Sequence, residues 1–201
     1  MKRRAAAALA AGLISTTLLL AGCASGDGIT SDYNSSDAGG NYVSGDGSVR
    51  TIAAGDRAKP VAFSGTTASG AQVSNTDYTG KVLVVNFWYA QCPPCRSEAP
   101  TLEKLAQKYG DDDVAFLGVD IRDDGPQAEA FQKEFGVSYP SVIDNQGGSS
   151  VLLAFAGQVS PNTTPTTLVV DKRGRVAARF SGEVSGSILD TVIGDTLGEK
   201  S

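Results

Sequence analysis

Hydrophobic residues fall into blocks that predict buried strands alternating with amphipathic helices. Lys81–Trp88 is a nearly continuous run of β-branched and aromatic side chains, which is typical of a central strand buried on both faces. Val114–Ile121 has the same character. A helix is predicted after each strand, from Pro93 to Gly110 and over Pro126–Phe135, because apolar residues recur at helical spacing and a glycine follows.

Shorter blocks complete the pattern on both sides of this central part. Val61–Phe63 and Ala71–Val73 alternate around glycines and predict an N-terminal β-hairpin. The C-terminal part predicts a short helix at Ser150–Phe155, a hairpin of Leu168–Asp171 and Arg175–Ser181, and a last helix at Ser187–Leu197. Strands that alternate with helices and close on a hairpin imply an α/β sandwich with a mixed central sheet.

The first 22 residues have the layout of a secretory signal peptide. Three cations at positions 2–4 precede the apolar stretch Ala5–Ala21, and the stretch ends in Leu-Ala-Gly-Cys23. This ending looks like a bacterial lipobox, so we predict a lipoprotein signal peptide over 1–22 and a lipid anchor on Cys23. The alternative is an uncleaved anchor helix with an incidental cysteine. Both interpretations place the rest of the chain outside the cytoplasm and attached to a membrane.

Residues 23–57 are predicted to be a flexible tether, and residues 58–201 the folded domain. The segment from Ala24 to about Gly55 is dominated by Ser, Gly, Asp and Asn, and has too few large apolar residues to repay the entropy of ordering. From Ala58 onward, apolar residues reach the density that a core requires.

Charge and composition exclude several functions. The net charge of −5 and the pI of about 4.7 argue against a nucleic-acid partner, because phosphate binding needs clustered Lys and Arg. The chain contains no His, which removes imidazole catalysis, the common zinc sites and haem ligation by His. We expect no metal site.

The motif Cys92-Pro93-Pro94-Cys95 lies between a predicted strand and a predicted helix. Backbone N–H groups and the helix dipole stabilise a thiolate at this position, lowering the pKa of the first thiol from about 8.5 toward roughly 7. Cys92 is therefore the predicted nucleophile, and Cys95, one turn later, is placed to resolve the mixed disulfide.

Other interpretations of the cysteine pair are weaker. A structural disulfide across two residues restrains little chain. A zinc site would need two more N or S ligands, and the only other cysteine is Cys23. We expect no cofactor beyond the redox-active disulfide itself.

Several motifs resemble the TlpA/ResA-type branch of the thioredoxin superfamily. They are Asn86-Phe87-Trp88, Cys92-Pro93-Pro94-Cys95-Arg96, Glu98, Pro100 and Thr164-Pro165-Thr166, and the resemblance covers about Lys59 to Leu197. It implies a thioredoxin-like three-layer sandwich. One departure is Gln91, which stands where the family usually has Trp before the first cysteine; Tyr89 is a candidate replacement for that aromatic side chain.

The resemblance also implies roles for other residues. Pro165 matches the superfamily's cis-proline beside the disulfide, and an ordinary trans proline is the alternative. Thr164 would offer backbone groups to an extended partner chain, so Thr164, Pro165, Pro93 and Pro94 are the predicted substrate contacts. Glu98 is implied as a third catalytic residue that tunes the thiols or moves protons. A solvated helix residue is the alternative for Glu98.

The function implied is an exported thiol–disulfide oxidoreductase that keeps exported proteins reduced, for example apocytochrome c. Since the outside of the membrane is oxidising, such a reductase needs a membrane electron donor. The alternatives are an oxidase or isomerase, a non-catalytic binding lipoprotein that reuses the fold, and a peroxidase. The intact cysteine pair counts against the binding protein, and no further resolving arrangement supports the peroxidase.

Overall fold

The computed structural model describes residues 48–110, 113–145, 151–159 and 163–199. The predicted signal peptide and Cys23 lie outside these ranges. The strands are β1 Val49–Thr51, β2 Ser64–Thr66, β3 Gln72–Ser74, β4 Val82–Trp88, β5 Val114–Asp120, β6 Ser141–Ile143, β7 Thr166–Val170 and β8 Val176–Ser181. The helices are η1 Asn75–Tyr78, α2 Pro93–Lys108, α3 Gly125–Phe135, α4 Val151–Ala154 and α5 Gly186–Gly198.

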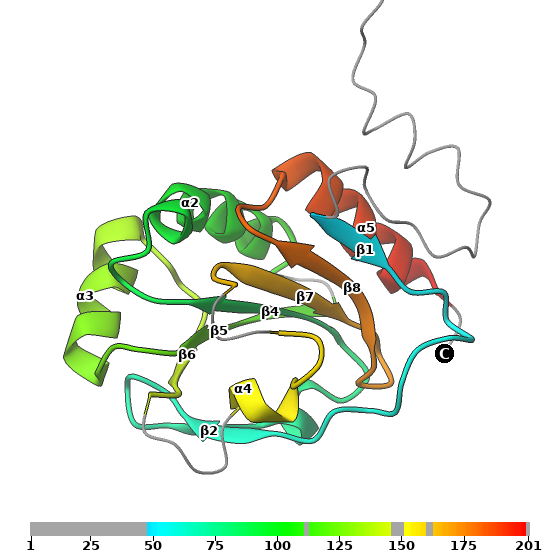
Figure 1. Cartoon of the computed structure of the whole chain (residues 1–201), viewed down its shortest axis with the longest axis horizontal. Coiled ribbons are helices and arrows are strands. Elements are labelled where there is room, and N and C mark those ends of the chain that lie inside the picture. Colours follow the sequence, from blue (N-terminus) through cyan, green and yellow to red (C-terminus); the bar gives the residue numbers. More distant parts are fainter. Residues whose placement is uncertain (1–47, 111–112, 146–150, 160–162, 200–201) are drawn as a thin grey trace, which may run out of the picture.

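A mixed sheet with the strand order β1-β8-β7-β4-β5-β6 runs through the middle of the molecule (Figure 1). β4 pairs in parallel with β5 and antiparallel with β7, so it lies in the centre of the sheet. All seven residues of β4 are buried. The prediction of a central strand at Lys81–Trp88 is confirmed. The run is almost entirely apolar because both faces of the strand are buried, as expected.

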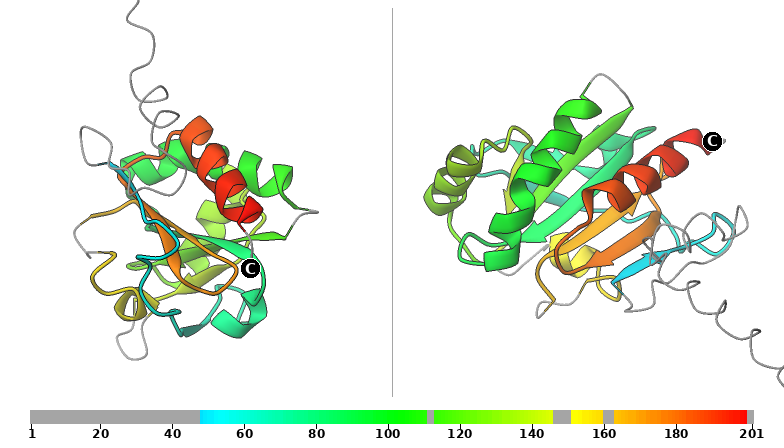
Figure 2. Two further views of the ribbon diagram at one scale, coloured as in Figure 1. Left: turned by 90° about the vertical axis from the view of Figure 1, so that its right-hand side faces the viewer. Right: turned by 90° about the horizontal axis from the view of Figure 1, so that it is seen from above.

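Helices and a hairpin cover the two faces of the sheet, as the views in Figure 2 show. α2 and α5 pack on one face, where Leu102, Leu105 and Leu189 belong to one apolar cluster. α4 and the β2–β3 hairpin lie on the other face, where Phe63 and Phe155 belong to a second cluster. The predicted three-layer α/β sandwich with an N-terminal hairpin is therefore confirmed, and it is consistent with a thioredoxin-like fold.

The folded part begins earlier than the sequence predicts. β1 lies within the segment 23–57 for which the sequence predicts a tether, yet Val49 is buried and pairs with Phe180 of β8. Three residues with a single large apolar side chain are too short a pattern to detect, and their order comes from a sheet edge built by residues more than 120 positions away. The three-residue strand β6, which pairs with β5, was also missed, because it is too short to show a hydrophobic pattern.

No helix within the described ranges is both long enough and apolar enough to cross a bilayer.

Gly118 is the point where the sheet tolerates no side chain. It lies in β5 between Asn86 and Ser141, and a Cβ atom added there would lie 2.0 Å from Ser141 Oγ and 2.9 Å from Trp88 Nε1. The backbone of a buried central strand cannot move away without breaking its ladder. Glycine is therefore required by packing at this position.

We predict that Gly118→Ala lowers the free energy of unfolding by about 1–3 kcal/mol, because overpacking forces neighbouring groups apart. Urea denaturation followed by circular dichroism measures this change. Gly110→Ala is the matched control, since its nearest neighbour would lie 3.5 Å away. Equal stability of the two variants would contradict this account of the strand.

Candidate active site

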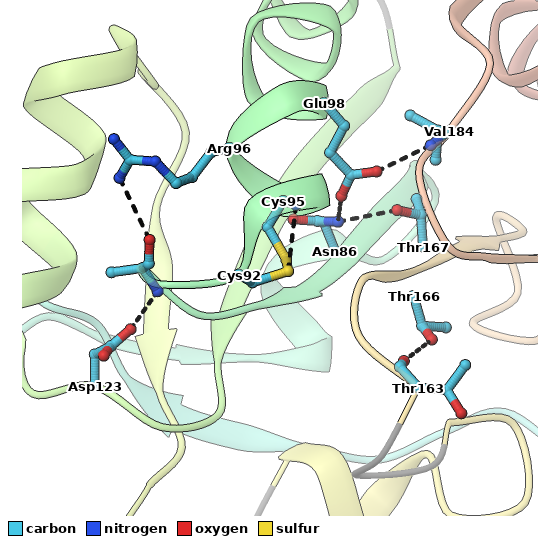
Figure 3. Close-up of a disulfide and its surroundings, with 11 residues drawn as sticks. Asn86, Cys92, Cys95, Arg96, Glu98, Asp123, Thr163, Thr166, Thr167 and Val184 are labelled. Carbon is cyan, nitrogen blue, oxygen red and sulfur yellow. Dashed lines mark hydrogen bonds between the residues drawn. A yellow bond between two sulfur atoms is a disulfide. The ribbon is translucent and has the colours of Figure 1, made fainter.

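Cys92 and Cys95 form a disulfide at the start of α2 (Figure 3). Cys92 is the N-cap residue, with extended backbone, and Pro93 and Pro94 occupy the first helical positions, where their missing N–H groups cost nothing. The backbone N–H of Cys95 donates to Cys92 Sγ over 3.2 Å. This donor and the positive end of the helix dipole stabilise negative charge on the Cys92 sulfur once the disulfide is opened.

Both cysteines are buried in the disulfide form, Cys92 at 1% and Cys95 at 2% exposure. Pro93 beside them is exposed, and Pro94 is partly exposed. A partner protein would therefore touch the prolines before it reaches a sulfur atom. The sequence predicted the reactive pair but gave no sign of how deeply it is buried.

The peptide bond between Thr164 and Pro165 is cis, which confirms that prediction. Thr166 follows it and pairs with Phe87 near the end of β4, so the register brings the Pro165 loop to the end of the sheet where α2 begins. Figure 3 shows Thr163 and Thr166 across from the disulfide. The carbonyl of Pro165 accepts a hydrogen bond from Gly182 N over 2.9 Å, which ties the loop to the end of β8.

Glu98 is completely buried, which rules out the alternative of a solvated helix residue. Its Oε1 accepts a hydrogen bond from Asn86 Nδ2 over 2.8 Å, and its Oε2 accepts one from Val184 N over 3.0 Å. The Asn86 amide also donates to Thr167 Oγ1 over 3.0 Å. The carboxyl group is therefore held between α2, β4 and the segment before α5 (Figure 3).

Burial raises the pKa of Glu98 to about 7, because a carboxylate is poorly solvated in this position. The two hydrogen bonds from Val184 and Asn86 lower it, and they offset only part of the desolvation. A small cavity lined by Asn86, Cys95 and Tyr139 lies next to this network. Glu98 thus has a protonation equilibrium near neutrality, and its hydrogen-bond partner Asn86 shares a cavity with the second cysteine.

The surface around the disulfide carries arginines stacked on aromatic rings. The guanidinium of Arg122 lies 4.0 Å from the ring centre of Tyr89, the candidate replacement for the missing Trp. The guanidinium of Arg96 lies 4.8 Å from the ring centre of Phe135. Trp88, in contrast, is buried against Phe131 and belongs to the core. Arg96 also forms an ion pair with Glu134 over 2.6 Å, so the rim of the site is partly aromatic and its positive charge comes from Arg122.

Two acids close to the site were missed at the sequence level. Asp120 ends β5 and Asp123 lies in the turn that follows, where its carboxylate accepts a hydrogen bond from the backbone N–H of Ala90. The sequence predicted the strand Val114–Ile121 but not its neighbour in the sheet. In the structure β5 runs parallel to β4, and parallel neighbouring strands end at the same edge of a sheet. Acids directly after β5 should therefore lie near the loop that leads to Cys92.

Comparison with known proteins now adds to this geometry. The sequence profile of the Redoxin family matches residues 53–193, which is more than half of the chain. The chain belongs to the Redoxin family. This assignment agrees with the resemblance on which the thioredoxin-like fold was predicted.

The chain is similar to individual proteins in sequence and in fold. The thiol-disulfide oxidoreductase ResA of Geobacillus thermodenitrificans is 36% identical over 110 residues, which are 55% of this chain and 60% of that protein. The chain thus matches less than two thirds of the length of this curated relative. The crystal structure of a DsbF homologue from Corynebacterium diphtheriae is 33% identical, covers 76% of this chain and 96% of its own, and has a TM-score of 0.67. A secreted thiol-disulfide isomerase from Corynebacterium glutamicum is 28% identical, covers 80% of this chain and 100% of its own, and has a TM-score of 0.68.

We predict that Cys92→Ser abolishes disulfide exchange, because the thiolate at the helix N-terminus is lost. Cys95→Ser should instead accumulate mixed disulfides, because the adduct on Cys92 can no longer be resolved by its neighbour. Turnover of a model disulfide measures the first effect, and non-reducing electrophoresis detects the second. Full activity of Cys92→Ser would show that the roles are assigned incorrectly.

Replacing Glu98 by Gln should remove a pH dependence of stability. Between the unfolded pKa of 4.5 and the folded value of about 7, the folded protein binds more protons than the unfolded chain, so wild-type stability falls as pH rises. Relative to wild type, Glu98→Gln should gain up to about 3 kcal/mol from pH 4 to pH 8. Denaturation of the oxidised proteins measures this gain, since the disulfide does not titrate. The exposed Glu129→Gln serves as control, and a parallel pH course for Glu98→Gln and wild type would contradict the assignment.

Proposed function

We propose that this protein is a thiol–disulfide oxidoreductase of the ResA/DsbE type that acts on exported proteins. The observation that carries the proposal is the Cys92–Cys95 disulfide at the N-terminus of α2, opposite the cis-Pro165 loop. Membership of the Redoxin family and the names of the relatives support it. The disulfide itself is the redox group, and Cys92, Cys95 and Glu98 are the proposed catalytic residues.

The reaction is an exchange of one disulfide for another. The Cys92 thiolate attacks a sulfur of the partner disulfide, forms a mixed disulfide and releases one partner thiolate. The Cys95 sulfur, after losing its proton, attacks Cys92 Sγ and releases the second partner thiolate. Two electrons pass to the partner, whose two sulfurs take up protons, and the enzyme ends as the Cys92–Cys95 disulfide.

Glu98 is the proposed acceptor for the proton of Cys95. Its pKa of about 7 lets it exist in both protonation states near neutral pH, which a general acid/base needs. Asn86 donates to Glu98 and lines the cavity that Cys95 also lines, so it joins the two groups. In this proposal Glu98 carries the proton across the separation between its carboxyl group and the Cys95 sulfur. The Cys95 sulfur remains the reacting atom.

The substrate-binding residues are Thr164, Pro165, Pro93 and Pro94. An extended partner segment would pair with the backbone of Thr164 while its cysteine faces Cys92, as in other strand-addition complexes. Pro93 is exposed at the rim, where the partner arrives. Arg122, stacked on Tyr89 and exposed, favours partner segments that carry acidic or aromatic side chains near the reacting cysteine.

The favoured physiological role is reduction of exported proteins, with apocytochrome c as the candidate substrate and a membrane protein as electron donor. The lipid anchor on Cys23 would hold the protein at the outer face of the cell membrane. Val49 pairs with Phe180, Phe180 with Thr167, and Thr167 with Asn86, the residue that donates to Glu98. The chain therefore enters the sheet level with Asn86, at the active-site end. An anchor that precedes Val49 would therefore be connected, through the predicted tether, to the active-site end of the domain.

Disulfide formation or isomerisation is the second candidate. It is favoured by the C. glutamicum relative, which is described as a secreted thiol-disulfide isomerase. The same residues perform both reactions, and the direction depends on the reduction potential of the Cys92–Cys95 pair. An oxidase keeps its disulfide unstable, whereas a reductase keeps it stable.

The reduction potential distinguishes the two roles. We expect equilibration with glutathione to give a value near that of thioredoxin, about −270 mV, and not near the value of about −120 mV of the oxidant DsbA. A strongly oxidising value would overturn the reductase assignment. Capture of partners on Cys95→Ser in the native cell, with Cys92→Ser/Cys95→Ser as control, then identifies the exported substrates.

A further inference from the structure

The turn after β5 holds a carboxyl group with no access to solvent. Asp120 is the last residue of β5, opposite Trp88 of β4, and its exposed fraction is 0%. Its Oδ1 accepts backbone hydrogen bonds from Arg122 over 3.1 Å and from Asp123 over 2.9 Å. Its Oδ2 meets no donor among the residues that the structure describes. A buried carboxylate oxygen without a donor has a high desolvation cost, which is relieved when the oxygen carries a proton.

Asp123 is the group with which Asp120 can share that proton. It is 8% exposed, and its own backbone N–H donates to Asp120 Oδ1 over 2.9 Å, which keeps the two acids together in one buried turn. Two carboxyl groups bond to each other only when one of them carries a proton. The interior position and the neighbouring Asp123 raise the pKa of Asp120 to about 7.

The other contact of Asp123 leads to the active site. Its Oδ2 accepts the hydrogen bond from Ala90 N, in the loop Tyr89–Gln91 that joins β4 to Cys92. The backbone N–H of Cys92 in turn donates to the Tyr89 carbonyl over 3.1 Å. Ala90 is thus fixed by Asp123 on one side, and its carbonyl accepts a hydrogen bond from Arg96 over 3.4 Å on the other.

We propose that Asp123 is a positioning residue for Cys92, which it holds through Ala90, and that a proton shared with Asp120 keeps Asp123 in place. When the pair loses this proton, two like charges face each other in a buried turn, and the hold on the loop weakens. The mechanism described above uses neither residue.

The remaining groups around the pair are accounted for. On the same turn, Arg122 is exposed and stacks on Tyr89, and Asp124 caps α3 by accepting from Gln127 N. From the segment after β6, the Asp144 carboxylate accepts from Val151 N and Leu152 N, and Asn145 donates to the Asp123 carbonyl over 2.6 Å. Among the described residues of this turn, these contacts leave Asp120 as the buried carboxyl with one oxygen that has no donor.

The inference concerns the reactivity of Cys92 toward any reagent, so it is independent of partner and redox direction. The test is the rate at which iodoacetamide alkylates Cys92 in the reduced full-length protein, followed on the Cys92 peptide by mass spectrometry. Each alkylation rate is divided by the fraction of Cys92 that is thiolate at that pH. The corrected rate then reports only the positioning and accessibility of the Cys92 sulfur. The variants are Asp123→Ala, Asp123→Asn and Asp120→Asn.

We expect Asp123→Ala to slow alkylation at pH 6 at least about tenfold, because Ala90 loses its acceptor. Asp123→Asn keeps an acceptor oxygen and should stay within about twofold of wild type at that pH. Asp120→Asn places an amide donor permanently toward Asp123. The corrected alkylation rate of Cys92 in this variant should therefore stay constant up to pH 8.5, where the corrected rate in wild type falls about threefold or more. Asp124→Asn, which removes a neighbouring charge and retains the helix cap, should follow wild type.

Wild-type rates for Asp123→Ala, or equal losses in Asp123→Ala and Asp123→Asn, would overturn the positioning role. A wild-type pH course for Asp120→Asn, or the same flattening in Asp124→Asn, would overturn the shared proton. If Asp123→Ala does not fold, the pH course of Asp120→Asn still decides, because a flattened course is expected only when the Asp120 proton acts through Asp123 on the loop before Cys92.

Discussion

The burial of β4 on both faces is the constraint on which the rest of the structure depends. All seven of its residues are buried, so the strand must run straight through the middle of the molecule and emerge at one end. The chain then turns through Tyr89–Gln91 and starts α2, which places Cys92 at the helix N-cap. The reactive sulfur therefore owes its position to a strand that contains no reactive side chain.

Two buried carboxyl groups lie at this same end of the sheet, although the interior of a protein normally excludes such groups. Glu98 reaches β4 from α2, and Asp120 lies opposite the last residue of β4 at the end of β5. Burial raises the pKa of each of these two carboxyl groups to about 7. Glu98 bonds to Asn86, which lines a cavity together with Cys95, and Asp120 bonds to the backbone of Asp123, whose side chain accepts from Ala90 in the loop before Cys92. Each sulfur therefore has a separate buried acid in its surroundings.

The sequence predicted the elements whose pattern is dictated locally. The long apolar run of β4 and the Cys-Pro-Pro-Cys motif before a helix were recognisable from neighbouring residues, whereas the cis-Pro165 loop was predicted from the resemblance to the thioredoxin superfamily. β1 and β6 were not predicted, since three residues are too short for a recognisable pattern, and each strand is ordered by its partner in the sheet. The burial of Glu98 and its bond to Val184 N depend on how α2 packs against the segment before α5, which no local pattern encodes. The role of Asp123 requires knowledge of the contact with Ala90, 33 positions away.

The central claim is that the helix N-terminus makes Cys92, and not Cys95, the attacking sulfur. Its most direct test is competitive alkylation of the reduced wild-type protein at pH 7, with the modified cysteines identified by peptide mass spectrometry. We predict that Cys92 is modified at least about ten times faster than Cys95, since only its sulfur receives the Cys95 N–H and the helix dipole. Equal rates, or faster modification of Cys95, would contradict the account.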